Sequence, residues 1–409
     1  MRIGLAVATA LAALVFITPP AMADEAAVKQ TQETMRSGEL ADGAAALQAM
    51  IDANGSNDEA RYGLGMIQFV QAVEHLSQGL YRYGLQPPHS IIMPIVRLPV
   101  PENPNPEPID YGKFRALLQR FVDDLTVTEK TLAAVNAADV KIPVALATIH
   151  YDANGDGAVT EDEQFLTVLS EILDIDAEDM GHADTFVVAF DKADTYWFRG
   201  YANVLMALGE FLLAYDWHES FDDSFHVFFP KAHSPFQEAL APPGTGFITS
   251  ETALADLISY LHIRWPVAEP ARLLAVRDHL KAVIALSRLD FAAIGAETDN
   301  DREWIPGPTQ TAATGSTITA GQVAAWHKVL DTYEALLDGK LLMPHWRMKQ
   351  GVNLRRVFEE PQPFDLVLWI TGPAALPYVE PGPMLTSAQW DAITAAFEDN
   401  FGSYAIWFN

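Results

Sequence analysis

The chain has 409 residues, 49% of them hydrophobic, so it can bury a sizeable core and is not a disordered protein. Its 54 acidic and 26 basic residues give a formal net charge of −28, which argues against nucleic acid and anionic membrane surfaces as partners and favours cations. It contains no cysteine, which excludes disulfides, thiolate metal sites and a cysteine nucleophile.

Residues 1–23 have the pattern of a secretory signal peptide. Arg2 provides a positive start, residues 3–17 are apolar, and small residues precede a cleavage point after Ala23. We therefore expect an exported protein, located in the periplasm or outside the cell. An uncleaved anchor is the alternative, although the apolar run is short for a membrane span. No later segment is predicted to cross a membrane.

Residues 24–90 are predicted to form a helical hairpin. Two helices are expected, over 26–52 and 58–84, around the turn "ANGSN". The second helix has apolar residues at helical spacing: Tyr62, Met66, Phe69, Val70, Val73 and Leu76. This hairpin resembles a single tetratricopeptide-like unit. Such units normally stack in series, and only one is found here.

A proline-rich connection follows at residues 91–112, with prolines at positions 94, 99, 101, 104, 106 and 108. Proline removes backbone donors and blocks helix, so extended irregular chain is expected here. This connection separates the hairpin from a body at 113–409.

Helical periodicity dominates the body and predicts a mainly α fold with little β structure. Helices are expected near 114–135, 192–215, 250–262, 269–295, 320–338 and 387–401, with another following the acidic loop described next. Thr319 and Gln322 form a capping box for the helix over 320–338, and Gly339 closes it. The best strand prediction is "FDLVLWI", residues 364–370.

The most informative stretch is "DANGDGAVTEDE", residues 152–163, which fits the twelve-residue template D-x-[DN]-x-[DN]-G-x5-E. A tight loop of this kind turns alternate oxygen-bearing side chains inward, and Gly157 permits the sharp turn. The expected ligands are Asp152, Asn154, Asp156, the backbone carbonyl of Ala158, Thr160 through a water, and the bidentate carboxylate of Glu163.

This loop resembles that of the EF-hand family, and the resemblance implies a bound Ca²⁺. The segment that leads into the loop, residues 144–151, departs from the family pattern because Pro143 leaves room only for a short helix. No second loop of this kind is present, whereas EF-hands usually work in pairs. These departures favour a structural calcium site over a sensor.

Four further stretches with acidic, histidine or basic residues are candidates for sites. Residues 174–184 are most simply a solvated acidic connection. Residues 218–233 contain His218, Glu219, Asp222, Asp223, His226 and His233, either as ordinary loop residues or as a zinc site. The segments Glu297–Trp304 and His345–Arg356 either form an ion-pair network or line a pocket for a small ligand.

No nucleophile elbow, P-loop or dinucleotide-binding motif is present in the sequence. The favoured hypothesis is an exported calcium-binding protein with a non-enzymatic binding or scaffold role and an unidentified protein partner. The alternative is a calcium-stabilised periplasmic hydrolase or small-ligand-binding protein that uses the pocket near Glu297 and His345. The sequence leaves enzymatic activity undecided, and leans against it.

Overall fold

The structure is a computed structural model that describes residues 24–86, 98–160, 163–168, 186–235, 258 and 263–408. Several sequence predictions lie wholly or partly outside these residues: the signal peptide, residues 91–97 of the proline-rich connection, the helix after the acidic loop beyond residue 168, the acidic stretch 174–184 and most of the helix expected at 250–262.

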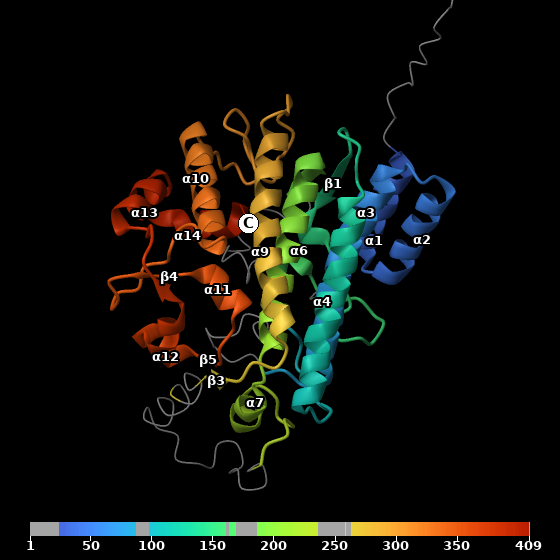
Figure 1. Cartoon of the computed structure of the whole chain (residues 1–409). Helices are drawn as coiled ribbons and strands as arrows, with labels where there is room; N and C mark the ends of the chain where they lie inside the picture. Colours follow the sequence, from blue (N-terminus) through green and yellow to red (C-terminus); the bar gives the residue numbers. More distant parts are fainter. Residues whose placement is uncertain are drawn as a thin grey trace, which may run out of the picture.

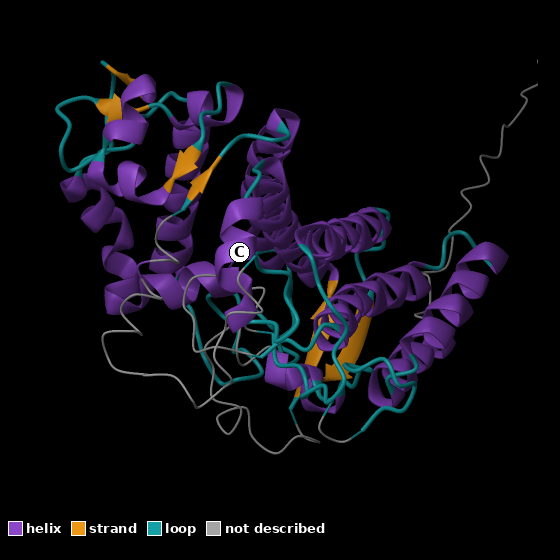
Figure 2. Ribbon diagram, turned by 90° about the horizontal axis from the view of Figure 1, so that it is seen from below, coloured by secondary structure: helices purple, strands orange, loops and turns teal. Residues whose placement is uncertain are grey.

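The predicted fold class is confirmed, because helices dominate and the described strands form only short pairs (Figure 2). All three pairs are antiparallel. They are β1 (Lys141–Ala145) with β2 (Val187–Asp191), β3 (Arg264–Trp265) with β5 (Phe364–Asp365), and β4 (Gly351–Val352) with β6 (Val379–Glu380).

Four long helices lie side by side at the centre of the molecule (Figure 1): α3 (Asp58–Arg82), α4 (Tyr111–Ala133), α6 (Lys192–Ala214) and α9 (Pro270–Ile294). Glycines let neighbouring helices approach closely. A Cβ at Gly209 of α6 would lie 2.4 Å from a methyl of Val122 on α4, and one at Gly65 of α3 would lie 2.4 Å from Leu132 of α4. The apolar residues between these helices form one core that continues into the N-terminal helices.

The single helix predicted over 26–52 is wrong, because the chain forms α1 (Glu25–Ser37) and α2 (Leu40–Ala53) instead. Gly38 ends α1 in the left-handed conformation, with φ of 74°, and its N–H donates to Thr34. The apolar pattern continues across this break, so periodicity alone does not reveal it. The resemblance to a tetratricopeptide-like hairpin stays a prediction.

The remaining helices lie beside α9, on the side away from α6, and at one end of the bundle (Figure 1). They are α7 (His218–Ser224), α10 (Ala320–Leu337), α11 (Leu354–Glu359), α12 (Leu366–Thr371), α13 (Ser387–Thr394) and α14 (Phe401–Phe408). Short 3₁₀ turns accompany them at Phe225–Val227, Pro373–Tyr378 and Ala395–Asn400. The predicted capping box of Thr319 and Gln322 is present.

The strand predicted over 364–370 is wrong beyond its first two residues. The side chain of Asp365 accepts the N–H of Leu368 and starts α12, which contains the rest of the apolar run. A short apolar run is compatible with either strand or helix, and here the N-cap decides.

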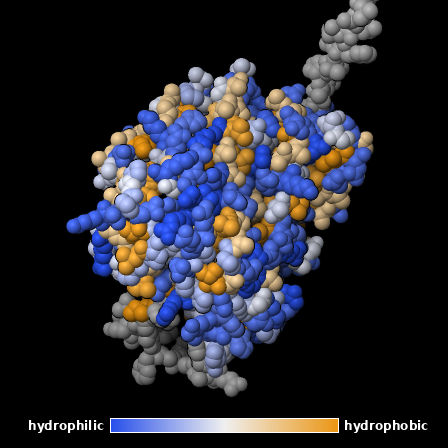
Figure 3. All heavy atoms as spheres, in the orientation of Figure 1, coloured by the Kyte–Doolittle hydropathy of each residue, from blue (hydrophilic) through white to orange (hydrophobic). Residues whose placement is uncertain are grey.

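None of the described helices is long and apolar enough to cross a membrane. The face shown in Figure 3 is mostly hydrophilic and carries scattered apolar patches.

The contact between α4 and α6 gives a first prediction. Gly209→Ala should lower the free energy of unfolding by about 1–2 kcal/mol, because a methyl group cannot fit beside Val122 and overpacking outweighs the gain in helix propensity. Gly321→Ala is the matched control, since Gly321 lies in the first turn of α10 with only an ordinary van der Waals contact near its added Cβ. Urea unfolding measures both variants. Equal stability of Gly209→Ala and wild type would contradict the close packing.

Candidate metal centre

The acidic loop is approached by a strand and a single 3₁₀ turn rather than by a helix. β1 ends at Ala145 and a 3₁₀ turn covers Leu146–Thr148, so the short helix predicted over 144–151 is wrong. After the loop, residues 165–168 are helical. The two sides are held together because Phe165 N–H donates to the carbonyl of Ile149 at 2.8 Å, and Tyr151 N–H to the carbonyl of Glu163 at 3.2 Å.

The loop is anchored on α1 and α3. His150 N–H donates to the carbonyl of Met35 at 2.8 Å, and the side-chain amide of Gln78 on α3 donates to the carbonyl of Asp152 at 2.9 Å. Val159 is half-buried and lies against Gly38, where a Cβ would come within 2.8 Å of its methyls. The break between α1 and α2 therefore makes room for the loop.

Asp152 lies at the centre of the turn in the loop. Its two carboxylate oxygens accept N–H groups from Gly155, at 2.7 Å, and from Gly157, at 2.9 Å. Gly157 has φ of 79°, the left-handed conformation that the sequence template requires at its sixth position.

Glu163 is 6% exposed and closes the loop from the other side. One carboxylate oxygen accepts the N–H of Ala153 at 3.0 Å, while the other accepts the N–H and the hydroxyl of Thr160 at 2.9 and 3.0 Å. Both carboxylate oxygens of Glu163 are therefore held inside the loop, at the position from which the sequence template expects a bidentate ligand.

The remaining expected ligands are on the outer part of the loop. Asp156 and Ala158 are exposed, and the Asn154 side chain accepts the N–H of Asp156 at 2.7 Å. Among the described residues, Asp152, Asp156 and Glu163 do not form a group whose ligand atoms all lie within 4.8 Å of one another. Closure around one ion therefore requires these carboxylates to move closer together.

A further carboxylate, which the sequence template does not include, faces the loop from α3. Glu74 accepts the N–H of Asp152 at 3.3 Å. Burial raises the pKa of Glu74 to about 7, and the charges of Asp152 and Glu163 also raise it. The neighbouring His75 acts in the opposite direction, but no ion pair in the described residues involves Glu74 or the acidic residues of the loop.

A cavity of about 310 Å³ lies beside the loop. Asn154, Thr160 and Glu163 form one side, and Pro99 to Pro101 of the proline-rich connection form another. The described end of that connection therefore lies against the candidate ligands.

The histidines of residues 218–233 do not form a converging set of ligands. Asp222 lies between His218, at 3.6 Å, and His233, at 3.7 Å, but the His218 ring stacks on Tyr111 and His233 is 69% exposed. The described residues contain one group of three or more candidate ligands within 4.8 Å of one another, and it includes none of these residues.

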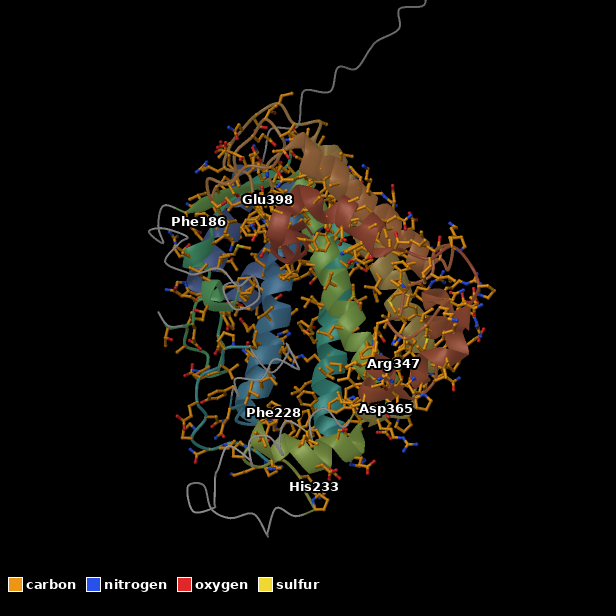
Figure 4. The ribbon with its side chains drawn as sticks, turned by 90° about the vertical axis from the view of Figure 1, so that its left-hand side faces the viewer. Phe186, Phe228, His233, Arg347, Asp365 and Glu398 are labelled. Atoms are coloured by element: carbon orange, nitrogen blue, oxygen red, sulfur yellow. The ribbon has the colours of Figure 1, made fainter. Side chains whose placement is uncertain are left out.

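The segments Glu297–Trp304 and His345–Arg356 lie apart. His345 bonds the carbonyl of Trp369 at the end of α12, and Arg356 pairs with Glu360 and Glu380. In Figure 4, Arg347 lies near Asp365 towards the lower end of the bundle, whereas Phe186 lies near the upper end. Phe186 directly precedes β2, and β2 is hydrogen-bonded to the segment Glu297–Trp304 through Ala189 and Arg302. No hydrogen bond or ion pair among the described residues joins the two segments, so the proposed shared pocket loses its main support.

Glu297 and Glu303 instead lie beside Asp191, which sequence reasoning did not select. One ligand oxygen from each of these three residues lies within 4.8 Å of the other two. Asp191 is the N-cap of α6, in a capping box with Asp194. The spacing of this box in the sequence "DKAD" marks a helix start, but nothing in it indicates that Asp191 lies near Glu297.

The turn of the acidic loop gives a second prediction. Gly157→Ala should lower the free energy of unfolding in chelator by about 1 kcal/mol, because a residue with a Cβ resists the left-handed conformation. Gly55→Ala is a matched control, because an added Cβ meets no atom within 4 Å at either glycine and only Gly157 has positive φ. Urea unfolding compares the two, and equal losses would contradict the role of Gly157.

Comparison of the chain with protein-family models, with curated proteins and with solved structures finds no match, so the site must be interpreted from its own geometry.

Proposed function

We propose that this is an exported protein that binds one Ca²⁺ in the loop Asp152–Glu163, and that the ion stabilises the attachment of the loop to α1 and α3. The observation that carries the proposal is the arrangement of Asp152 and Glu163, whose four carboxylate oxygens all accept hydrogen bonds from within the loop. Export rests on the N-terminal sequence pattern alone.

The chemistry of the donor set supports a hard cation. The loop offers carboxylate, amide, hydroxyl and backbone carbonyl oxygens, which calcium prefers, and offers no nitrogen or sulfur ligand. Glu74 adds negative charge from α3 on the same side as Asp152. A bound cation would compensate this charge, since no ion pair in the described residues includes Glu74 or the acidic residues of the loop.

The surroundings of the loop support a structural role rather than a switch. Sensor loops open a pair of helices, whereas here a strand and one 3₁₀ turn precede the ligands. The hydrogen bonds from Gln78 to Asp152 and from His150 to Met35 already tie the loop to two helices. The ion would therefore strengthen existing contacts. An affinity in the range of extracellular modules, with Kd of about 10⁻⁴–10⁻³ M, would suffice outside the cytoplasm.

Binding of this kind has a defined effect on stability. A ligand that binds only the folded state adds about 1.4 kcal/mol when its free concentration is about ten times its Kd. We propose a non-enzymatic binding or scaffold role, in which the ion acts on folding rather than on a substrate.

Hydrogen exchange of the loop amides tests the proposal. Calcium at millimolar concentration should slow exchange of residues 153–160 in the wild-type protein, because ligands drawn to the ion fix the loop backbone. Glu163→Gln should abolish this protection, since it removes the ligand that closes the loop. Glu102→Gln, an exposed glutamate in the proline-rich connection, should retain it.

Two results would contradict the proposal. One is wild-type protein whose loop amides exchange at the same rate in calcium and in chelator. The other is protection that persists unchanged in Glu163→Gln.

A further inference from the structure

Five carboxyl groups gather where α6 begins and α9 ends. Asp191 and Asp194 belong to the start of α6, Asp290 to the last turns of α9, and Glu297 and Glu303 to the segment that follows α9. Four of them are less than one-tenth exposed, and Glu297 is half-buried. Because α6 and α9 lie side by side (Figure 1), residues distant in sequence meet at this end of the bundle.

Packing fixes the segment that contains Glu303. The adjacent Trp304 is 4% exposed, and its ring lies 5.3 Å from Trp197 of α6 and 6.1 Å from Phe190 of β2. The carbonyl of Arg302 also accepts the N–H of Ala189 in β2. The carboxylate of Glu303 is therefore held beside Asp191.

Positive charge at this place is scarce. Lys141 of β1 lies opposite Asp191 in the sheet, but its ammonium group pairs with Asp299 at 2.6 Å and with Asp301 at 4.0 Å. No other ion pair in the described residues involves the cluster, so one shared lysine faces five carboxyl groups. Carboxylates this close together in a buried setting repel one another, so a proton or a cation must neutralise part of their charge.

The spacing of three of these groups fits a single ion. Ligand oxygens of Asp191, Glu297 and Glu303 all lie within 4.8 Å of one another. Two oxygens on opposite sides of a calcium ion are separated by about 4.8 Å, twice a bond of about 2.4 Å. The three oxygens therefore lie within the diameter of one coordination shell.

Asp290 provides an independent observation. It is 1% exposed, and neither of its carboxylate oxygens has a hydrogen-bond partner. It lies in the last turns of α9, shortly before the segment that contains Glu297, and the charges of Glu297 and Asp191 act on it. The hydroxyl of Tyr62 on α3 is also buried without a partner and is influenced by Asp191, Asp194 and Asp290. Buried polar atoms without partners are costly, and a hydrated cation would satisfy them.

We propose that Asp191, Glu297 and Glu303 coordinate a second divalent cation, with Asp290 compensating its charge from the buried side. The all-oxygen donor set selects a hard cation of the calcium or manganese type. The ion would join β2 and the start of α6 to the segment after α9. This site is independent of the acidic loop.

Calorimetry on the full chain carrying Glu163→Gln tests this site with the loop disabled. Titration with CaCl₂, and separately with MnCl₂, should show one remaining binding event. Adding Glu297→Gln should weaken it by about tenfold or more, since even groups that only support metal ligands have effects of this size. Asp301→Asn is the matched control, because it removes an equal charge from the same segment but lies outside the triad, and it should leave affinity within about twofold.

The wild-type chain provides a second measurement that does not depend on the Glu163→Gln background. Equilibrium dialysis should give two calcium ions per wild-type chain and one in Glu297→Gln, with circular dichroism confirming the fold. Absence of the second ion, or equal weakening by Asp301→Asn and Glu297→Gln, would overturn the proposal and indicate carboxyl groups that share protons. If the loop alone fails to bind, Glu163→Gln will not change the stoichiometry, so the two sites are judged separately.

Discussion

Repulsion between carboxylates is the constraint on which this structure depends. The chain has about twice as many acidic as basic residues, and they are unevenly distributed. Many acidic residues form ordinary ion pairs, such as Glu210 with Arg272 and Glu129 with Arg199. Two places lack such compensation: the loop that contains Asp152 and Glu163, and the cluster around Asp191. In both, several carboxyl groups are held close together by helices or turns. A bound cation at each place, as we propose, would resolve the same electrostatic problem.

The β1–β2 strand pair connects these two places. β1 leads through one 3₁₀ turn into the acidic loop, and β2 ends at Asp191, whose side chain starts α6. Lys141 and Asp191 face each other across the pair, so the pair lies between the loop attached to α1 and α3 and the cluster at the end of α9. On this account, cations at both ends would fix the N-terminal helices and the segment after α9 to the same two strands.

Part of this arrangement could be predicted from the sequence. The long helices α4, α6, α9 and α10 follow from apolar periodicity and caps, and their observed bounds lie close to those expected. The candidate ligand positions of the loop follow from a twelve-residue template, because all of them lie within one short segment of the sequence. The break at Gly38 was missed because a glycine within an apolar pattern costs a helix only about 1 kcal/mol. Asp191 was missed because its relation to Glu297 depends on how α6 and α9 pack, and pairing Glu297 with His345 failed for the same reason.

The most direct test of the central claim is the dependence of global stability on free calcium. The free energy of unfolding should be measured by urea titration from chelator to about 10 mM calcium, at constant ionic strength so that general screening does not contribute. The account predicts that stability rises with calcium, with a limiting slope that corresponds to the release of two ions on unfolding. A stability that is the same in chelator and in calcium would show that protons and solvent alone compensate these carboxylates, and would contradict the account.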